Sequence, residues 1–131
     1  MNEVLEFLQN SQTFFVATND GEQPRVRPFG FVMEYDKRLY FCTGNLKPFY
    51  QQLQNNPKLE ICACKDGEWL RIEGKASFDS RLEVKQKVFE LDEGVAEIYG
   101  TPENTVFEVF FLENAKATFY SFTGDRRTVS V

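Results

Sequence analysis

Two Asp-Gly dipeptides, Asp20-Gly21 and Asp66-Gly67, each separate two runs of residues that are rich in β-branched and aromatic side chains. Asp-Gly suits the left-handed backbone of a tight turn, so each dipeptide predicts a hairpin between two strands. Strands joined by successive hairpins pair antiparallel. The chain is therefore not expected to form the parallel sheet of a doubly wound α/β fold, in which strands and helices alternate regularly.

The remaining segments follow from hydrophobic periodicity and from turn residues. Strands are expected over Thr13–Thr18, Pro24–Tyr35, Leu39–Cys42, Leu59–Lys65, Glu68–Phe78, Val106–Leu112 and Ala115–Phe122, the last two pairing around Glu113-Asn114. Helices are expected over Met1–Gln9, over Leu46–Asn55 with Asn45 as its cap, and from the capping box Ser80-Arg81-Leu82-Glu83 to about Leu91. Val95–Gly100 is ambiguous, and Thr123–Val131 is expected to fray or to pair weakly.

The proline and glycine inside Pro24–Tyr35, Pro28 and Gly30, predict an edge, a bulge or a bend there. The expected fold is mainly β with short flanking helices, with six or seven strands in a closed or nearly closed antiparallel barrel. A length of 131 residues suits one domain, residues 1–131, and 42% hydrophobic residues are enough for its core.

The chain contains no histidine, which excludes Ser-His-Asp and Cys-His catalysis and histidine-ligated zinc or haem. An enzyme of this composition relies on other side chains or on a borrowed cofactor. Three cysteines, Cys42, Cys62 and Cys64, form no even disulfide framework, and we expect them to be reduced core thiols without a metal. No long apolar stretch and no basic signal region are seen, so we expect a soluble cytoplasmic protein without a membrane span.

Charge is distributed unevenly along the chain. Against 15 basic residues there are 20 acidic ones, a net charge of −5, which disfavours nonspecific binding to nucleic acid. The segment Gly21–Pro48 nevertheless has five basic and three acidic residues, whereas Glu83–Glu113 has two basic and eight acidic ones. A local basic region on an acidic chain favours a small anionic ligand over a polyanion.

Donors for such an anion are concentrated in Thr43–Pro48, where a strand is expected to lead into a helix. Gly44 gives conformational freedom, Thr43 and Asn45 are polar, and Lys47 places a positive charge in the first turn. A lysine there opposes the helix dipole unless an anion is bound. Segment Thr43–Pro48 is equally consistent with a capped helix and a solvated lysine.

Arg25 and Arg27 are two residues apart on an expected strand, so their side chains point to one side. One of them is expected to reach the Thr43 loop if the two strands are neighbours, and otherwise both belong to an exposed polar face. The chain also has 14 Phe, 5 Tyr and 1 Trp, most of them expected in the core and a few free to flank a planar ring.

The segments Pro24–Phe29, Leu39–Thr43 and Asn45–Lys47, followed by a helix that ends at Asn56-Pro57, resemble the FMN-binding split β-barrel family. Pyridoxamine 5′-phosphate oxidase and the nitroimidazole-resistance proteins belong to that family. The resemblance implies an antiparallel split β-barrel and a homodimer with FMN at the subunit interface. The residues that it implies for cofactor binding are Arg25, Arg27, Pro28, Phe29, Thr43, Asn45, Lys47, Trp69, Arg71 and Tyr120.

Within that set the resemblance assigns different roles. Lys47 would hold the FMN phosphate, with hydrogen bonds from Thr43 and Asn45, and Arg27 would reach the phosphate or the ribityl chain. The backbone from Arg27 to Phe29 would face the flavin ring. Three residues, Trp69, Arg71 and Tyr120, are candidates for contacts across the dimer.

The implied activity is that of an FMN-dependent oxidoreductase passing electrons from a nicotinamide donor to a small acceptor. The C-terminal Arg-x-His motif of pyridoxamine phosphate oxidases is absent, as is the histidine near the flavin of nitroimidazole-resistance relatives. Vitamin B6 oxidation is therefore not implied. The alternatives are a noncatalytic flavin carrier or sensor, a barrel that binds single-stranded nucleic acid, and haem or deazaflavin in place of FMN.

Overall fold

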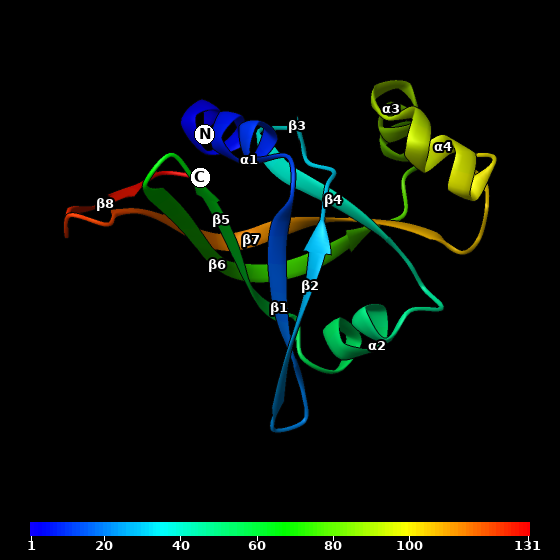
Figure 1. Cartoon of the computed structure of the whole chain (residues 1–131). Helices are drawn as coiled ribbons and strands as arrows, with labels where there is room; N and C mark the ends of the chain where they lie inside the picture. The colour runs from blue at the N-terminus through cyan, green and yellow to red at the C-terminus, as the bar shows by residue number, and fades with distance from the viewer.

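The computed structural model describes residues 1–131 and shows one strongly curved antiparallel sheet with helices around it (Figure 1). Its strands are β1 (Phe14–Asp20), β2 (Gln23–Phe29), β3 (Met33–Tyr35), β4 (Arg38–Gly44), β5 (Lys58–Lys65), β6 (Glu68–Asp79), β7 (Phe107–Ser121) and β8 (Arg126–Val129). The helices are α1 (Asn2–Ser11), α2 (Pro48–Asn55), α3 (Leu82–Leu91) and α4 (Glu93–Tyr99). None of these helices combines the length and the hydrophobicity that crossing a lipid bilayer requires.

The strands follow the order β2-β1-β5-β6-β7-β4-β3 across the sheet, and β8 pairs with β7. Every pair is antiparallel. The two end strands, β2 and β3, do not pair with each other, so the barrel remains split between them. The prediction of a mainly β split barrel is confirmed, with eight strands where six or seven were expected.

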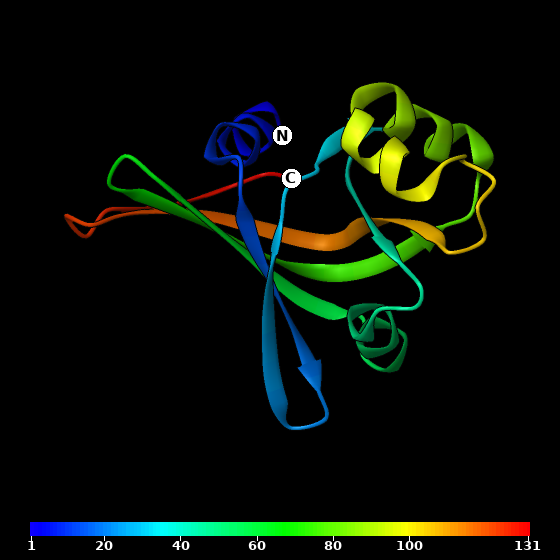
Figure 2. The ribbon, with the colours of Figure 1, turned by 45° about the vertical axis from the view of Figure 1, so that its right-hand side comes forward.

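The main core lies on the concave side of the sheet and contains 18 buried residues. Helix α1 contributes Val4 and Leu8, which are four residues apart and therefore on one helix face. Helix α2 contributes Phe49 and Leu53 at the same spacing. In Figure 2 these two helices lie at opposite ends of the curved sheet. Short helices such as these gain their stability mainly from this packing.

The ends of β4 and β7 near α3 are buried on both faces. Phe110 and Leu112 of β7 face the main core, whereas Phe107, Val109 and Phe111 belong to a second cluster that Val84 and Val88 of α3 complete. This explains why the sequence of β7 is an almost continuous apolar run there and does not alternate. The α3–α4 pair is thereby held against one end of the sheet.

A buried polar network fixes the start of α3. The Tyr40 hydroxyl donates to Asp79 Oδ2 at 2.8 Å, and the Arg81 guanidinium donates to the same oxygen at 2.9 Å. Burial and the hydrogen bond to Asp79 raise the pKa of Tyr40 to about 12, so the hydroxyl stays a donor. Burial alone would raise the pKa of Asp79, but the hydrogen bonds from Arg81 and Tyr40 outweigh it and hold that pKa below its ordinary value.

The segment Pro24–Tyr35, expected as one strand, forms two strands with different partners. Its first part is β2, which pairs with β1, and its end is β3, which pairs with β4. Residues 30–32 leave the sheet between them. Pro28 lies in β2, an end strand, as the expectation of an edge or bend requires.

The hairpin expected around Glu113-Asn114 is wrong, because β7 is one strand from Phe107 to Ser121. It pairs with β6 on both sides of this point, with a register shift between Glu73 and Lys75. Asn114 has a φ of 53°, and the extra residue produces a bulge that bends the strand. Asn favours left-handed backbone in turns and in bulges alike, so the local signal does not distinguish them.

Several local expectations also differ. Helix α2 begins at Pro48 with Lys47 as N-cap, and neither it nor α3, whose N-cap is Arg81, has a capping side-chain hydrogen bond. The ambiguous Val95–Gly100 belongs mostly to α4, and the C-terminal segment forms β8. Cys62 and Cys64 are exposed, so the expectation that all three cysteines are core thiols is wrong for these two.

The pH dependence of stability tests the Tyr40–Asp79–Arg81 network. Because the pKa of Asp79 is lower in the folded chain, the network stabilises the fold above the ordinary aspartate pKa of about 3.9 and loses this effect as the pH falls further. We expect Asp79→Asn to lower the free energy of unfolding at neutral pH by about 1–3 kcal/mol and to flatten its fall in acid. Chemical denaturation between neutral and acid pH measures both, with Asp66→Asn in an exposed turn as control. An unchanged acid dependence in D79N would contradict this assignment.

Candidate functional site

A cavity of about 400 Å³ opens beside the end of β2, the strand whose second edge is unpaired. It is lined by Pro28, Phe29, Gly30 and Phe31 from β2 and the following loop, by Cys42, Thr43 and Lys47 from β4 and the α2 entry, and by Asp92, Gly94, Val95, Ile98 and Tyr99 from the α4 region. Apolar walls with a few convergent polar groups are typical of small-molecule sites, and the volume falls in their usual range.

Thr43 and Lys47 reach this cavity from the turn between β4 and α2. The Lys47 amide donates to the Gly44 carbonyl at 3.1 Å, and the Tyr50 amide donates to the Lys47 carbonyl at 3.1 Å, so the chain turns directly into the helix. The Lys47 ammonium has no ion pair, and the Thr43 hydroxyl has no hydrogen bond within the chain. A free cation, a free hydroxyl and an uncapped helix start on one cavity fit an anion.

Asn45 has hydrogen-bond partners within the chain. Its side-chain amide donates to the Thr105 carbonyl at 2.6 Å and to Glu108 Oε2 at 2.8 Å. Its backbone amide donates to the Val106 carbonyl at 2.9 Å. Asn45 therefore ties the 43–47 turn to the start of β7 and does not line the cavity.

Arg27 also has partners within the chain. Its guanidinium donates to the Thr18 hydroxyl at 2.7 Å and to Gln52 Oε1 at 2.8 Å, and it lies over the Phe49 ring at 4.7 Å. These contacts join β2 to β1 and to α2. Arg27 does not line the cavity, although it contacts the helix whose N-cap, Lys47, does.

Arg25 lies nearer the tip of the β1–β2 hairpin. It pairs with Asp20 at 3.2 Å, and both side chains are about half exposed. The structure therefore brings Pro28, Phe29, Thr43 and Lys47 together on one cavity and leaves both arginines outside it.

The remaining predicted residues, Trp69, Arg71 and Tyr120, form a group on the convex face of the sheet. The Trp69 and Tyr120 rings stack at 5.0 Å, and the Arg71 guanidinium lies 5.3 Å from the Tyr120 ring centre. None of the three lines the cavity of the same chain.

The convex face also exposes apolar surface. Phe15 is 48% exposed and Val26 is 68% exposed. Phe15 lies opposite Cys62 in the register, and Cys62 lies opposite Arg71, so an exposed row crosses three strands. We call this surface, made by Phe15, Val26, Cys62, Cys64, Trp69, Arg71 and Tyr120, the convex face.

Sequence analysis missed the wall that α4 contributes. Asp92 Oδ1 accepts the Val95 amide at 3.1 Å and caps the helix, which ends at Gly100 with a φ of 83°. An Asp N-cap and a Gly seven residues beyond Glu93 are the signals that could have identified this helix. That it lines the same cavity as Lys47 depends on the tertiary fold and has no local signal.

Cys42 lines the cavity but is not chemically activated. Burial, with a smaller contribution from the Asp92 carboxylate, raises the pKa of its thiol to about 12, and Lys47 acts in the opposite direction. The thiolate is the nucleophilic form of cysteine, so Cys42 is inert at neutral pH. This agrees with the expectation of a packed, reduced thiol at this position.

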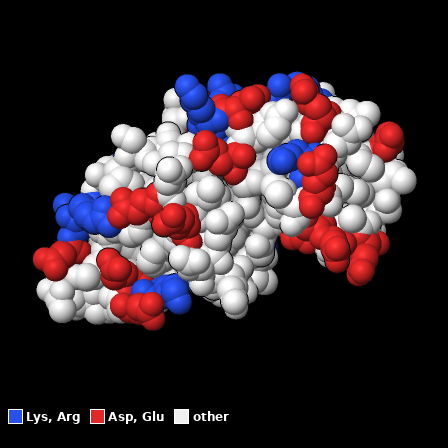
Figure 3. Space-filling view, turned by 90° about the horizontal axis from the view of Figure 1, so that it is seen from above, with Lys and Arg blue, Asp and Glu red and all other residues white.

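Charges around the cavity are mainly acidic. Figure 3 shows acidic side chains gathered at the end of the molecule where α3 and α4 lie. These helices and their junction carry Glu83, Glu90, Asp92, Glu93 and Glu97. Lys47 is the only basic residue that lines the cavity. The cavity lining therefore provides one positive charge, which is enough for a single anionic group.

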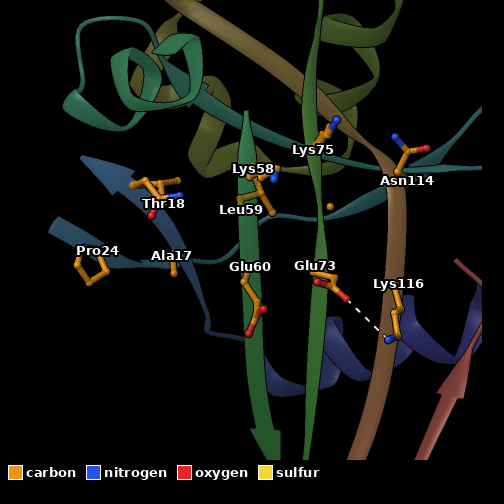
Figure 4. A pocket seen from close by; sticks show the side chains of 12 residues that line it. Ala17, Thr18, Pro24, Lys58, Leu59, Glu60, Glu73, Lys75, Asn114 and Lys116 are labelled. Carbon is orange, nitrogen blue, oxygen red and sulfur yellow. Dashed lines mark ion pairs between the residues drawn. The ribbon is translucent and has the colours of Figure 1, made fainter. Parts of the chain in front are cut away.

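A larger hollow of about 550 Å³ lies on the convex side of β1, β5, β6 and β7 (Figure 4). Its glutamates are paired, Glu73 with Lys116 at 3.9 Å and Glu60 with Arg71 at 3.0 Å. Two of its twelve lining residues are hydrophobic, Ala17 and Leu59, against six of twelve in the cavity beside β2. The larger hollow lacks the apolar walls of a small-molecule site, and we therefore take the cavity beside β2 as the candidate site.

Comparisons with known proteins identify similar chains. The family model of pyridoxamine 5′-phosphate oxidase matches residues 1–120. A NimC/NimA family protein from Clostridium acetobutylicum is 37% identical, with 100% of this chain and 92% of that chain covered and a TM-score of 0.94. No curated protein matches.

Two more distant structures share the fold. General Stress Protein 26 from Bacillus anthracis is 18% identical, with 98% and 97% of the two chains covered and a TM-score of 0.76. The heme storage protein HutZ from Vibrio cholerae is 19% identical, with 87% and 91% covered and a TM-score of 0.67. At these identities the similarity shows the fold alone.

The Cys42 environment predicts selective thiol chemistry. Alkylation of the folded protein near neutral pH should leave Cys42 unmodified, because its pKa of about 12 keeps it protonated. Unfolding in guanidinium should make it react as fast as an ordinary cysteine. Peptide mass spectrometry after iodoacetamide treatment measures the modification at each position. Stoichiometric labelling of Cys42 in the folded protein would contradict the prediction.

Proposed function

The chain belongs to the pyridoxamine 5′-phosphate oxidase-like family of split β-barrels, and from this premise we propose that it is an FMN-binding oxidoreductase that works as a homodimer. One observation carries the proposal. An unpaired lysine and an unbonded hydroxyl, Lys47 and Thr43, face a cavity at the open edge of β2 beside the start of α2. This donor set suits a phosphate monoester.

Two parts of the cavity match two parts of FMN, the phosphate and the flavin ring. Lys47, Thr43 and the first turn of α2 would hold the phosphate. The flavin ring would lie against Phe29, Phe31 and the neighbouring β2 backbone, whose outer edge has no partner strand. Unpaired strand edges supply hydrogen-bonding groups at fixed spacing, which suits the polar edge of a planar heterocycle.

Bound FMN would supply the redox chemistry of a two-electron transfer between a nicotinamide donor and a small acceptor. The side chains of this protein bind and orient the cofactor and exclude water from it. Arg27 and Asn45 hold the walls of the site through their contacts with β1, α2 and β7. No lining side chain is a suitable general base, because the Cys42 pKa is about 12 and Asp92 caps α4.

Flavin fits this site better than haem does. The chain has no histidine to ligate iron, and the cavity offers a thiol that stays protonated at neutral pH. Lys47 and Thr43 match a phosphate, a group that haem lacks. The heme storage protein of Vibrio cholerae resembles this chain in fold alone.

The convex face supports the homodimer. Trp69, Arg71 and Tyr120 lie away from the cavity of their own chain, so they can contribute to a cofactor site only in a second copy. The same face exposes Phe15 and Val26, and exposed apolar surface of this kind marks interaction sites. A two-fold dimer that uses this face would bring the aromatic group of one protomer to the partner.

Titration of flavin-free protein tests the proposal. We expect FMN to bind with quenching of its fluorescence and Lys47→Ala to weaken that binding by about 1.5–3 kcal/mol, the usual value of a charge-assisted contact. Riboflavin lacks the phosphate, so its affinity should be nearly the same for wild type and K47A.

Lys37→Ala is the matched control, because it removes an equal charge from an exposed turn. The absorption spectrum of the purified protein and analysis of its released chromophore then distinguish FMN from deazaflavin and haem. A wild-type protein that binds neither FMN nor riboflavin would contradict the proposed function. Bound FMN without turnover of reduced nicotinamide would identify a carrier or sensor in its place.

The dimer proposal predicts the effect of a charge on the convex face. Phe15→Glu should raise the dimer dissociation constant at least about tenfold, because a carboxylate would be buried without a partner. Its affinity for FMN should fall at the same protein concentrations. Sedimentation velocity measures the association, and Leu82→Glu, which changes a partly exposed leucine on α3, is the control. A dimer that is equally stable in F15E would show that another surface mediates it.

A further inference from the structure

Gly44 is required by a close approach and not by its backbone conformation. Its φ lies outside the left-handed region, whereas a Cβ at this position would be 2.9 Å from the Tyr99 hydroxyl oxygen. Contacts that short are essentially never seen for a real Cβ. The same Cβ would be 3.5 Å from Tyr99 Cε1 and from Val106 Cγ1, which is ordinary contact. The absence of a side chain at Gly44 thus makes room specifically for the hydroxyl of Tyr99.

Tyr99 is held in this place by groups other than its hydroxyl. Its ring packs on Phe107 with centroids 4.8 Å apart, and its carbonyl accepts the Asn104 side-chain amide at 2.7 Å. The hydroxyl has no hydrogen-bond partner in the chain and lies beside Gly44. Tyr99 lines the same cavity as Thr43 and Lys47. Burial raises the pKa of Tyr99, so the hydroxyl remains a donor at neutral pH.

We propose that the Tyr99 hydroxyl is a third side-chain donor to the cofactor phosphate and that Gly44 makes room for it. This inference rests on the proposed function and extends it to a residue of α4 that the sequence pattern left unassigned. Lys47 supplies charge, Thr43 supplies a hydroxyl from β4, and Tyr99 approaches the same turn from the opposite wall. The α3–α4 pair thereby binds the cofactor directly and selects for its phosphate.

Tyr99→Phe is the first test, because it removes the hydroxyl and keeps the ring against Phe107. We expect the dissociation constant for FMN to rise about ten- to a hundredfold, the effect of one hydrogen bond to a charged acceptor, and the constant for riboflavin to stay unchanged. Tyr35→Phe is the matched control, since Tyr35 packs against Tyr40 and does not line the cavity. Thermal unfolding of the flavin-free variants verifies that each is folded.

A double-mutant cycle with Gly44→Ala isolates the contact itself. The alanine should weaken FMN binding about three- to tenfold when residue 99 is tyrosine, and should add little in the Y99F background, where no hydroxyl is displaced. Additive effects of the two substitutions would overturn the proposed coupling. Equal losses for FMN and riboflavin in Y99F, or no loss at all, would overturn the phosphate assignment. If the wild-type protein binds no flavin, the proposed function itself fails. If the wild-type protein binds FMN but no more tightly than Y99F does, only the role of Tyr99 fails.

Discussion

Backbone hydrogen bonding connects the strands from β2 round to β3 and stops there, and the candidate site depends on this interruption. A closed barrel would have no free strand edge. Here side chains fill the gap: Phe29 packs on Phe49 at 5.0 Å, and both lie against Phe110 at 6.5 Å and 5.8 Å. This aromatic group excludes water from the core, and the outer edge of β2 remains free to form hydrogen bonds. The cavity, the start of α2 and the free edge therefore occur together because the sheet does not close.

Local sequence signals predicted much of this fold. Both Asp-Gly turns join adjacent antiparallel strands, and the contiguous Thr43–Lys47 segment indeed places two polar groups on one cavity. Such features are encoded within a few residues, where turn preference and periodicity are decisive. Pro28 and Phe29 reach the same cavity because they end the strand beside the gap. The candidate site could thus be predicted where its residues are neighbours along the chain.

Local sequence signals were insufficient where the outcome depends on distant partners. Asn114 favours left-handed backbone, but only the continuous pairing of β7 with β6 makes that conformation a bulge and not a hairpin turn. Arg27 has the residue type of a phosphate ligand, yet Thr18 and Gln52 engage its guanidinium within the fold. The contribution of α4 was missed because the cavity that it lines together with Lys47 joins segments about fifty residues apart, a separation that secondary-structure periodicity does not report.

Polar side chains around the gap have two distinct functions. Arg27 and Asn45 have partners on neighbouring elements, and their hydrogen bonds hold the walls in place. Lys47, Thr43 and Tyr99 have no such partners, and a lysine at the N-cap of α2 opposes the helix dipole. The ammonium and the two hydroxyls therefore add little to the stability of the ligand-free fold. A bound anion would reverse the unfavourable term at Lys47 and satisfy both hydroxyls at once, so the groups that stabilise the empty protein least are those through which a ligand would stabilise it most.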